Sequence, residues 1–401
     1  MNKKLMALLL ALVMCTSLLA GCGSSASAPE ETTPVETIDV EATPEATDST
    51  EDDAAAKETY ERYKKIYDKY DPDTVVMKVN GEDVTWSTYF YWLYSMATQF
   101  EAVYGITDWT KPFDLNSTCE SYLKNYIEKY VMQFWTIKQK AVEAGITLDE
   151  EDEKEIQDGW DTAKESAGAE TEEEFLDDLD SIFLPADLYR RLLSTTVYNN
   201  KLYMSYYGEM GKNLSDEDAL AYAEDAGYMH AKHILVRTVD DEGNALDEET
   251  VAEKLAKVND ILAELKGVPA NELEAKFDEL MTLNSEDSGL AGYPDGYYFV
   301  SGEMVEQFEN AVKELENGGL SEVVETGYGY HIILRLPLSP EGIVEYPDVN
   351  LRYVASASLY NNMLDEWFNE STIEYENGFD TISYNDLFDY VPENADSANA
   401  D

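Results

Sequence analysis

The stretch "HAKHILVR", residues 230–237, contains two of the three histidines in this chain of 401 residues. The Ile, Leu and Val after the second histidine favour a β-strand. Because side chains alternate between the two faces of a strand, His230 and His233 are expected on opposite sides of a sheet. The third histidine, His331, lies in a second strand-like run, residues 327–338. If the two runs are neighbouring strands, one of the first pair can hydrogen-bond to His331 within the sheet.

Histidines at this spacing could also belong to a metal site or to an ordinary core. A zinc site would need the first pair to share a face, as on a helix, and the strand pattern argues against that, so no metal is expected. Two histidines on adjacent strands can also be core side chains with satisfied hydrogen bonds. Spacing alone leaves that second possibility open.

Helical patterns separate the two strand-like runs. Asp247 can cap a helix that ends at Gly267, and a second short helix follows. A glycine-rich loop covers residues 285–296, and a third helix is expected around residues 304–315. The run "SEVVET", residues 321–326, then forms a strand before the last one. The predicted order over residues 227–338 is strand, helix, helix, helix, strand, strand, which is an α+β unit with helices packed on a small antiparallel sheet.

A mostly helical body is expected to surround this unit. Residues 74–226 begin with a hairpin signal at Asn80 and Gly81 and continue into long helices rich in aromatic side chains. One more helical stretch follows in residues 339–390, and it is too short to be a domain. We therefore expect it to return to the first body, so that the α+β unit is an insertion into a mostly helical domain.

The chain begins with a segment that resembles a bacterial lipoprotein signal, residues 1–22. Two lysines and an apolar run precede "LAGC", in which Cys22 would be the lipidated residue. An ordinary signal peptide with an incidental cysteine is the alternative. Residues 23–73 are expected to form a disordered acidic tether and lead-in, and residues 391–401 a disordered tail. The lipid would place the protein on the cell membrane, facing the extracytoplasmic side.

Composition excludes some classes of function. The formal charge is −55, from 28 basic and 83 acidic residues, which argues against nucleic acid as a partner and against docking on anionic lipid through basic patches. Removal of Cys15 with the signal and lipidation of Cys22 would leave only Cys119, so no disulfide is expected, and Cys119 is predicted to be a packed thiol. Two large lobes of alternating strands and helices, as in solute-binding lipoproteins, are not found.

Four blocks of sequence carry a resemblance to a known family. In order, "AKHILVR", "LNSEDSG", "SGEMVEQFENAV" and "LSEVVETGYGYHIILRL" resemble the parvulin family of peptidyl-prolyl cis-trans isomerases over residues 228–337. The whole chain is similar to extracytoplasmic foldase lipoproteins of the PrsA type and, more remotely, to SurA-like periplasmic chaperones. The family's "GGDLGWF" segment is replaced here by "GLAGYPDGYYF".

The resemblance implies a set of active-site residues. The histidine pair falls on His233 and His331, the active-site acid on Asp287, and the threonine beside the second histidine on Thr326. The pocket for the proline ring falls on Met304, Phe308 and Phe299, with Met304 and Phe308 expected one helical turn apart. His230 matches no active-site position and is expected at the surface. From spacing alone, Met304 and Phe308 could equally be core residues and Asp287 a turn residue.

The function implied is non-covalent isomerisation of X-Pro bonds in unfolded exported proteins, without a cofactor. The alternative is a holding chaperone whose parvulin-like unit is catalytically idle. Aromatic side chains of the helical body could line a groove for unfolded segments, and this body could also form a homodimer.

Overall fold

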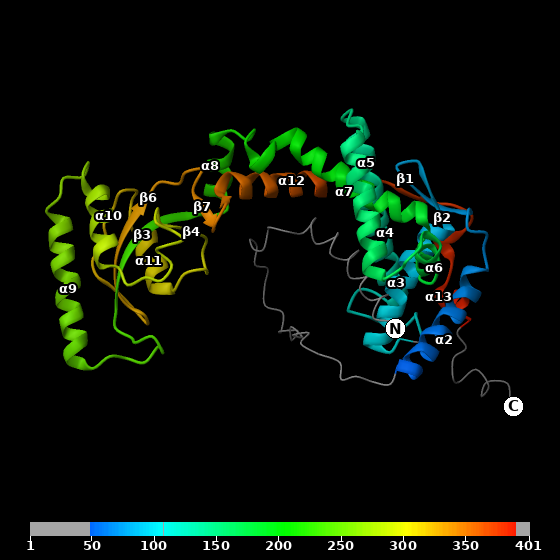
Figure 1. Ribbon diagram of the computed structural model, residues 1–401, viewed down its shortest axis with the longest axis horizontal. Coiled ribbons are helices and arrows are strands. Elements are labelled where there is room, and N and C mark those ends of the chain that lie inside the picture. Colours follow the sequence, from blue (N-terminus) through cyan, green and yellow to red (C-terminus); the bar gives the residue numbers. More distant parts are fainter. Residues whose placement is uncertain (1–48, 107, 390–401) are drawn as a thin grey trace. The chain divides into compact units, whose positions relative to one another are not determined.

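The computed structural model describes residues 49–389 apart from residue 107 (Figure 1). The predicted signal peptide, Cys22, most of the predicted tether and the tail lie outside the described residues. Contacts between Cα atoms divide the described chain into unit 1, residues 49–205 and 361–389, and unit 2, residues 206–360. The predicted insertion of one unit into another is therefore found. No helix among the described residues is long and apolar enough to cross a membrane.

Unit 1 is mostly helical with a small antiparallel sheet. Its elements are α2 (Ser49–Tyr67), β1 (Val75–Val79), β2 (Glu82–Thr85), α3 (Trp86–Tyr104), α4 (Cys119–Glu143), α5 (Glu150–Ala167), α6 (Glu172–Asp180), α7 (Ala186–Tyr207), β9 (Ile373–Tyr375), a 3₁₀ turn (Phe379–Thr381) and α13 (Tyr384–Leu387). The predicted hairpin turn joins β1 to β2, with positive φ at Asn80 (51°) and Gly81 (84°). On the other edge of β1, Met77 pairs with Tyr375 of β9. The returning C-terminal segment thus completes the sheet of unit 1.

Aromatic side chains fill the core of unit 1. Trp86, Tyr89 and Phe90 of α3 are buried, and Trp86 and Phe90 pack against rings of other segments, Phe379 and Phe183. The hydroxyls of Tyr89 and Tyr384 are 2.7 Å apart, which satisfies two buried polar atoms. Cys119, at the start of α4, is a buried free thiol, as predicted.

The predicted disordered lead-in is too long. Residues 49–67 form α2, and Tyr63 and Ile66 of this helix are buried in the core of unit 1. The acidic composition before Tyr60 suggested a disordered segment, but aromatic residues three and four apart give the end of the helix an apolar face.

Unit 2 contains the predicted α+β arrangement. Its elements are a 3₁₀ turn (Glu209–Gly211), α8 (Asp216–Asp225), β3 (Met229–Arg237), α9 (Glu248–Lys266), α10 (Leu273–Asn284), β4 (Tyr297–Phe299), α11 (Glu306–Glu314), β5 (Val324–Thr326), β6 (Gly329–Leu336), β7 (Ile343–Glu345), β8 (Val349–Asn350) and α12 (Leu351–Glu370). The main sheet is antiparallel with the order β4-β3-β6-β5. The short β4 was not predicted.

Both faces of this sheet are covered. Ile234 and Ile332 pack with α9 and α10, whereas Ala231 and Ile333 pack with Phe308 of α11 on the opposite face. Burial on both faces explains why β3 and β6 read as nearly continuous apolar runs. α8 also joins this unit, because Ala223 packs with Tyr298 and Leu351. The two boundaries between unit 1 and unit 2 therefore lie within α7 and within α12, and not at the predicted positions 226/227 and 338/339.

Candidate active site

The pairing of β3 with β6 brings two histidines together. Strand register places His233 opposite Ile333 and Leu235 opposite His331, so the two histidines are diagonal neighbours on the face covered by α11. Their Nδ1 atoms are 3.0 Å apart, and their ring planes differ by 17°. Both side chains are buried.

Each ring uses its second nitrogen as well. Nε2 of His233 lies 3.3 Å from Oδ2 of Asp287, and Nε2 of His331 lies 2.9 Å from Oγ1 of Thr326. Asp287, His233, His331 and Thr326 therefore form one continuous hydrogen-bonded chain. The structure brings together all four residues that the resemblance assigned to the catalytic group.

The direction of these hydrogen bonds follows from the protonation states. Burial, and next the adjacent His233, lower the pKa of His331 to about 3, so that ring is neutral at physiological pH. A carboxylate can only accept, so His233 donates from Nε2 to Asp287. Nδ1 of His331 shares a hydrogen bond with Nδ1 of His233, and Nε2 of His331 shares one with the Thr326 hydroxyl. The backbone N–H of Tyr328 donates to the same hydroxyl oxygen, and the hydroxyl itself lies 3.4 Å from the carbonyl oxygen of Gly329, to which it can donate.

Asp287 is a largely buried carboxylate held by three donors. Burial opposes its ionisation, but hydrogen bonds from His233 and Tyr297 outweigh burial and lower the pKa of Asp287 to about 2. The hydroxyl of Tyr297 donates to Oδ2 at 2.6 Å, and the backbone N–H of Gly289 donates to Oδ1 at 3.2 Å. Asp287 is therefore ionised at physiological pH.

Tyr297 is a site residue that the sequence analysis did not identify. Its ring is 5.6 Å from the His233 ring and 4.8 Å from that of Tyr293, between ring centroids. Burial and the charge of Asp287 raise the pKa of Tyr297, so the phenol stays protonated and donates. A Cβ atom on Gly289 would lie 2.0 Å from the Tyr297 hydroxyl, so this approach requires glycine. Nothing in the sequence "GYYF" indicated that its first tyrosine would hydrogen-bond to an aspartate ten residues earlier.

Aromatic side chains cover the histidine pair. The Phe308 ring meets the edges of both imidazoles, at 5.3 Å from His233 and 5.7 Å from His331. Phe299 of β4 lies 5.9 Å from Phe308, and both are buried. Met304 is half-buried against the same cluster. The three residues assigned to the proline pocket are therefore gathered next to the histidines.

The predicted helical spacing of Met304 and Phe308 is wrong. α11 begins at Glu306, and Met304 lies in the preceding turn. This turn is fixed by Glu309, whose carboxylate accepts hydrogen bonds from the backbone N–H of Gly302 at 2.7 Å and from Ser301. These donors, together with Lys313, lower the pKa of Glu309 to about 2. Met304 therefore contacts the cluster from a turn that is held by hydrogen bonds to Glu309, and not from the surface of a helix.

His230 is not a surface residue, contrary to expectation. It is buried, its ring stacks on Tyr298 with 4.1 Å between centroids, and its nitrogens contact the carbonyl oxygens of Asp295 at 2.8 Å and Pro337 at 2.9 Å. It lies on the opposite side of β3 from His233, as strand alternation predicts. The reason for its burial is the loop before β4, which the sequence did not place over the end of the sheet.

The described residues offer no group of three or more His, Cys, Asp or Glu side chains placed to hold a metal ion.

The family model of the PPIC-type PPIASE domain matches residues 219–335, which include β3 through most of β6 and all the site residues described above. Unit 2 contains a PPIC-type domain. The resemblance to the parvulin family is thus confirmed.

Two curated relatives of this chain have names that agree with the domain match. It is 31% identical over 156 residues to the putative peptidyl-prolyl cis-trans isomerase Cbf2 of Campylobacter jejuni (strain 81-176), covering 37% of this chain and 51% of that protein. It is 30% identical over 198 residues to the foldase protein PrsA of Halalkalibacterium halodurans, covering 45% and 50%. The chain spans about half the length of the curated relatives it matches.

A solved structure also aligns with this chain. The crystal structure of PrsA from Bacillus subtilis covers 75% of this chain and 92% of its own, at 20% identity and a TM-score of 0.22.

Proposed function

We propose that unit 2 catalyses cis-trans isomerisation of X-Pro peptide bonds. The observation that carries this proposal is the joining of an ionised Asp287, a hydrogen-bonded histidine pair and an apolar cluster around Phe308 on one side of the sheet. The match to the PPIC-type domain supports it.

The reaction needs no bond to be broken. Amide resonance gives the prolyl bond a barrier of about 18–20 kcal/mol, so a catalyst only has to bind the twisted amide more tightly than the planar one. Phe308, Phe299 and Met304 would clasp the pyrrolidine ring and exclude water. Proximity and water exclusion strengthen any electrostatic effect at the bond.

Asp287 would act through its charge. Twisting the amide ends conjugation, so the carbonyl oxygen loses negative charge. A carboxylate close to that oxygen therefore disfavours the planar state relative to the twisted one. The histidine pair would hold Asp287 in position, and Thr326 would fix the ring of His331. None of these groups has to act as a nucleophile.

We further propose that the protein is a foldase for exported proteins, held to the extracytoplasmic side of the membrane by a lipid on Cys22. The names of the curated relatives support the foldase function, and the "LAGC" sequence supports the anchor. Proline-containing unfolded segments of exported proteins would be its substrates, and a homodimer through unit 1 stays part of this proposal.

A holding function is the second candidate. Val103, Tyr104 and Leu115 are large apolar side chains of unit 1 that are 63%, 59% and 101% exposed. Exposed apolar groups of this kind can contact unfolded chains without any isomerase activity.

The experiment that separates the two candidates is the isomerisation rate of a short proline peptide with the full chain and with Asp287→Ala and His233→Ala. We expect a large loss of kcat/KM in both variants. Asp241→Ala is the matched control, because Asp241 is a fully exposed carboxylate of the same unit. Equal rates in all four proteins would remove the enzyme proposal and leave the holding function, which suppression of aggregation of an unfolded protein would measure separately.

A further inference from the structure

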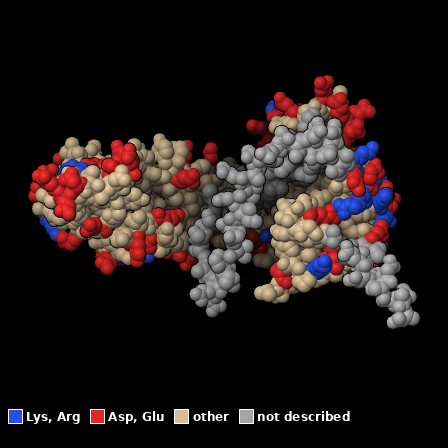
Figure 2. Space-filling model, turned by 90° about the horizontal axis from the view of Figure 1, so that it is seen from below, with Lys and Arg blue, Asp and Glu red and all other residues tan. Residues whose placement is uncertain are grey.

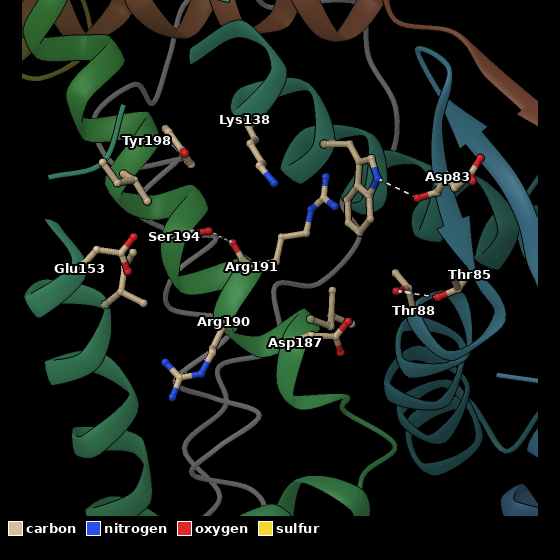
Figure 3. A pocket seen from close by; sticks show the side chains of 14 residues that line it. Asp83, Thr85, Thr88, Lys138, Glu153, Asp187, Arg190, Arg191, Ser194 and Tyr198 are labelled. Atoms are coloured by element: carbon tan, nitrogen blue, oxygen red, sulfur yellow. Dashed lines mark hydrogen bonds between the residues drawn. The ribbon is translucent and has the colours of Figure 1, made fainter. Parts of the chain in front are cut away.

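Unit 1 contains a hollow of about 490 Å³ that no step of the isomerase proposal uses. Side chains from β2, α3, α4, α5 and α7 line it (Figure 3). Its volume is within the range of roughly 300–1,000 Å³ that is typical of small-ligand sites. All of its lining residues belong to unit 1.

Arg191 of α7 is held rigidly beside this hollow. Its Nη2 atom donates to Glu82 at 2.7 Å, and its guanidinium group lies 3.6 Å from the centroid of the Trp135 ring. The Nε atom of the same guanidinium is buried and has no hydrogen-bond partner among the described residues. The guanidinium group lines the hollow, and its N–H groups that do not bind Glu82 are suited to donate to an anion.

Lys138 of α4 lines the same hollow. It is half-buried, and its ammonium group forms no ion pair or hydrogen bond within the described range of the chain. Figure 3 shows the Lys138 and Arg191 side chains extending into the same part of the hollow. Ser194 and Thr88 add hydroxyl groups to the lining. The inner part of the hollow is thus rich in donors and positive.

The acidic lining residues lie further out. Glu153, Asp187 and Asp83 are all exposed, and Asp83 is bound by Lys78 at 3.3 Å. Figure 2 shows that Asp and Glu side chains are widespread over the visible surface of this acidic chain. Acidic residues at the rim of the hollow are therefore typical of the surface, whereas the two cationic side chains inside it are not. Such a rim repels polyanions but can accept hydrogen bonds from amide N–H groups.

We propose that this hollow binds the free C-terminal carboxylate of a peptide chain. The carboxylate oxygens accept from the Lys138 ammonium group, which has no partner among the described residues, and from the guanidinium group of Arg191, which lines the hollow and also pairs with Glu82. Trp135 and Leu148 provide an apolar wall for the last side chain of the peptide. The rim carboxylates accept from backbone N–H groups of the preceding residues and disfavour additional acidic groups.

The test is binding of labelled, proline-free pentapeptides that end in leucine to the full chain, measured by fluorescence anisotropy. The absence of proline separates this site from the isomerase site, so failure of either proposal is visible independently. Three peptides are compared, namely the free acid, its C-terminal amide, and an amide with Asp at the fourth position. We expect the free acid to bind at least about tenfold more tightly than either amide. The plain amide lacks the charge-assisted hydrogen bonds, and the Asp-containing amide has its carboxylate in the wrong place to form them.

Two variants and one control locate the binding. Lys138→Met should weaken binding of the free acid about tenfold and leave binding of the amide unchanged. Arg191→Lys should also weaken binding of the acid, because it keeps the charge but lacks the planar set of guanidinium donors. Lys129→Met, an exposed lysine on the same helix α4 outside the hollow, should have no effect. Any of four results would overturn the proposal. The free acid and the amide could bind equally, the Asp-containing amide could bind as tightly as the acid, or the unchanged chain could show no saturable binding. The fourth result is an equal effect of Lys138→Met and Lys129→Met.

Discussion

Replacing Tyr297 with Phe tests the electrostatics of the site with a change of one oxygen atom. The phenol donates to Oδ2 of Asp287 at 2.6 Å, whereas the ring, which Phe keeps, packs against His233 and Tyr293. A hydrogen bond to a charged group contributes roughly 1.5–3 kcal/mol, and one pKa unit corresponds to about 1.4 kcal/mol. We therefore expect the pKa of Asp287 to rise by about one to two units from its value of about 2.

The same change has a consequence for stability with a defined sign. The folded-state pKa of Asp287 is lower than the ordinary value of 3.8, so its ionisation stabilises the folded protein above about pH 4. This contribution, on the order of 2 kcal/mol, is lost as the pH falls from about 4 to about 2. In Tyr297→Phe most of it should already be absent at pH 7, and the difference between the two proteins should disappear near pH 2.

Two assays check this prediction. The Asp287 carboxyl carbon can be titrated by NMR, and the free energy of unfolding can be measured with denaturant at several pH values. Tyr293→Phe is the matched control, since the Tyr293 hydroxyl accepts from the backbone N–H of Tyr346 and does not contact Asp287. An unchanged Asp287 midpoint in Tyr297→Phe, or the same shift in Tyr293→Phe, would refute the reasoning.

Three further changes probe the same cluster. Phe308→Ala should lower the free energy of unfolding by about 3–5 kcal/mol through the cavity it leaves, whereas Phe308→Leu should keep the fold but lose isomerase activity, measured by denaturation and by peptide isomerisation. Thr326→Val should remove the hydrogen-bond partner of Nε2 of His331 at a cost of about 1–3 kcal/mol, which NMR would detect as a shift of the His331 ring signals. Gly289→Ala should displace the Tyr297 hydroxyl, and its pH profile should therefore resemble that of Tyr297→Phe.

Strong local signals predicted the framework of unit 2. The Ile-Leu-Val run after His233 and the similar run after His331 define two strands, and the antiparallel register of these strands places both imidazoles next to each other on one face. In unit 1, Asn80 and Gly81 defined a two-residue turn that the structure contains. These features depend on local conformational preference and on strand alternation, which a sequence carries directly.

The missed features depend on long-range contacts. β4 has three residues, and its pairing with β3 is what brings Tyr297 next to Asp287 and lays the preceding loop over His230. The position of Met304 depends on Glu309 binding the turn before α11. No local pattern distinguishes these partners from the many other acidic and aromatic residues of the chain.

The charges of the site residues give Tyr297 a role in the segment that replaces the family's "GGDLGWF". His331 is neutral and Thr326 and Tyr297 are uncharged, so the carboxylate of Asp287 is the charge on which the proposed mechanism depends. Nε2 of His233 at 3.3 Å and the backbone N–H of Gly289 at 3.2 Å also contact this carboxylate. The shorter hydrogen bond from Tyr297 acts together with that from His233 to hold the carboxylate ionised and in place, and it requires Gly289 to leave room for the phenol. In the proposed mechanism, the loop that differs from the family segment therefore supplies a second side chain that hydrogen-bonds to Asp287. Isomerase activity should then depend on Tyr297 more than on the remaining residues of that loop.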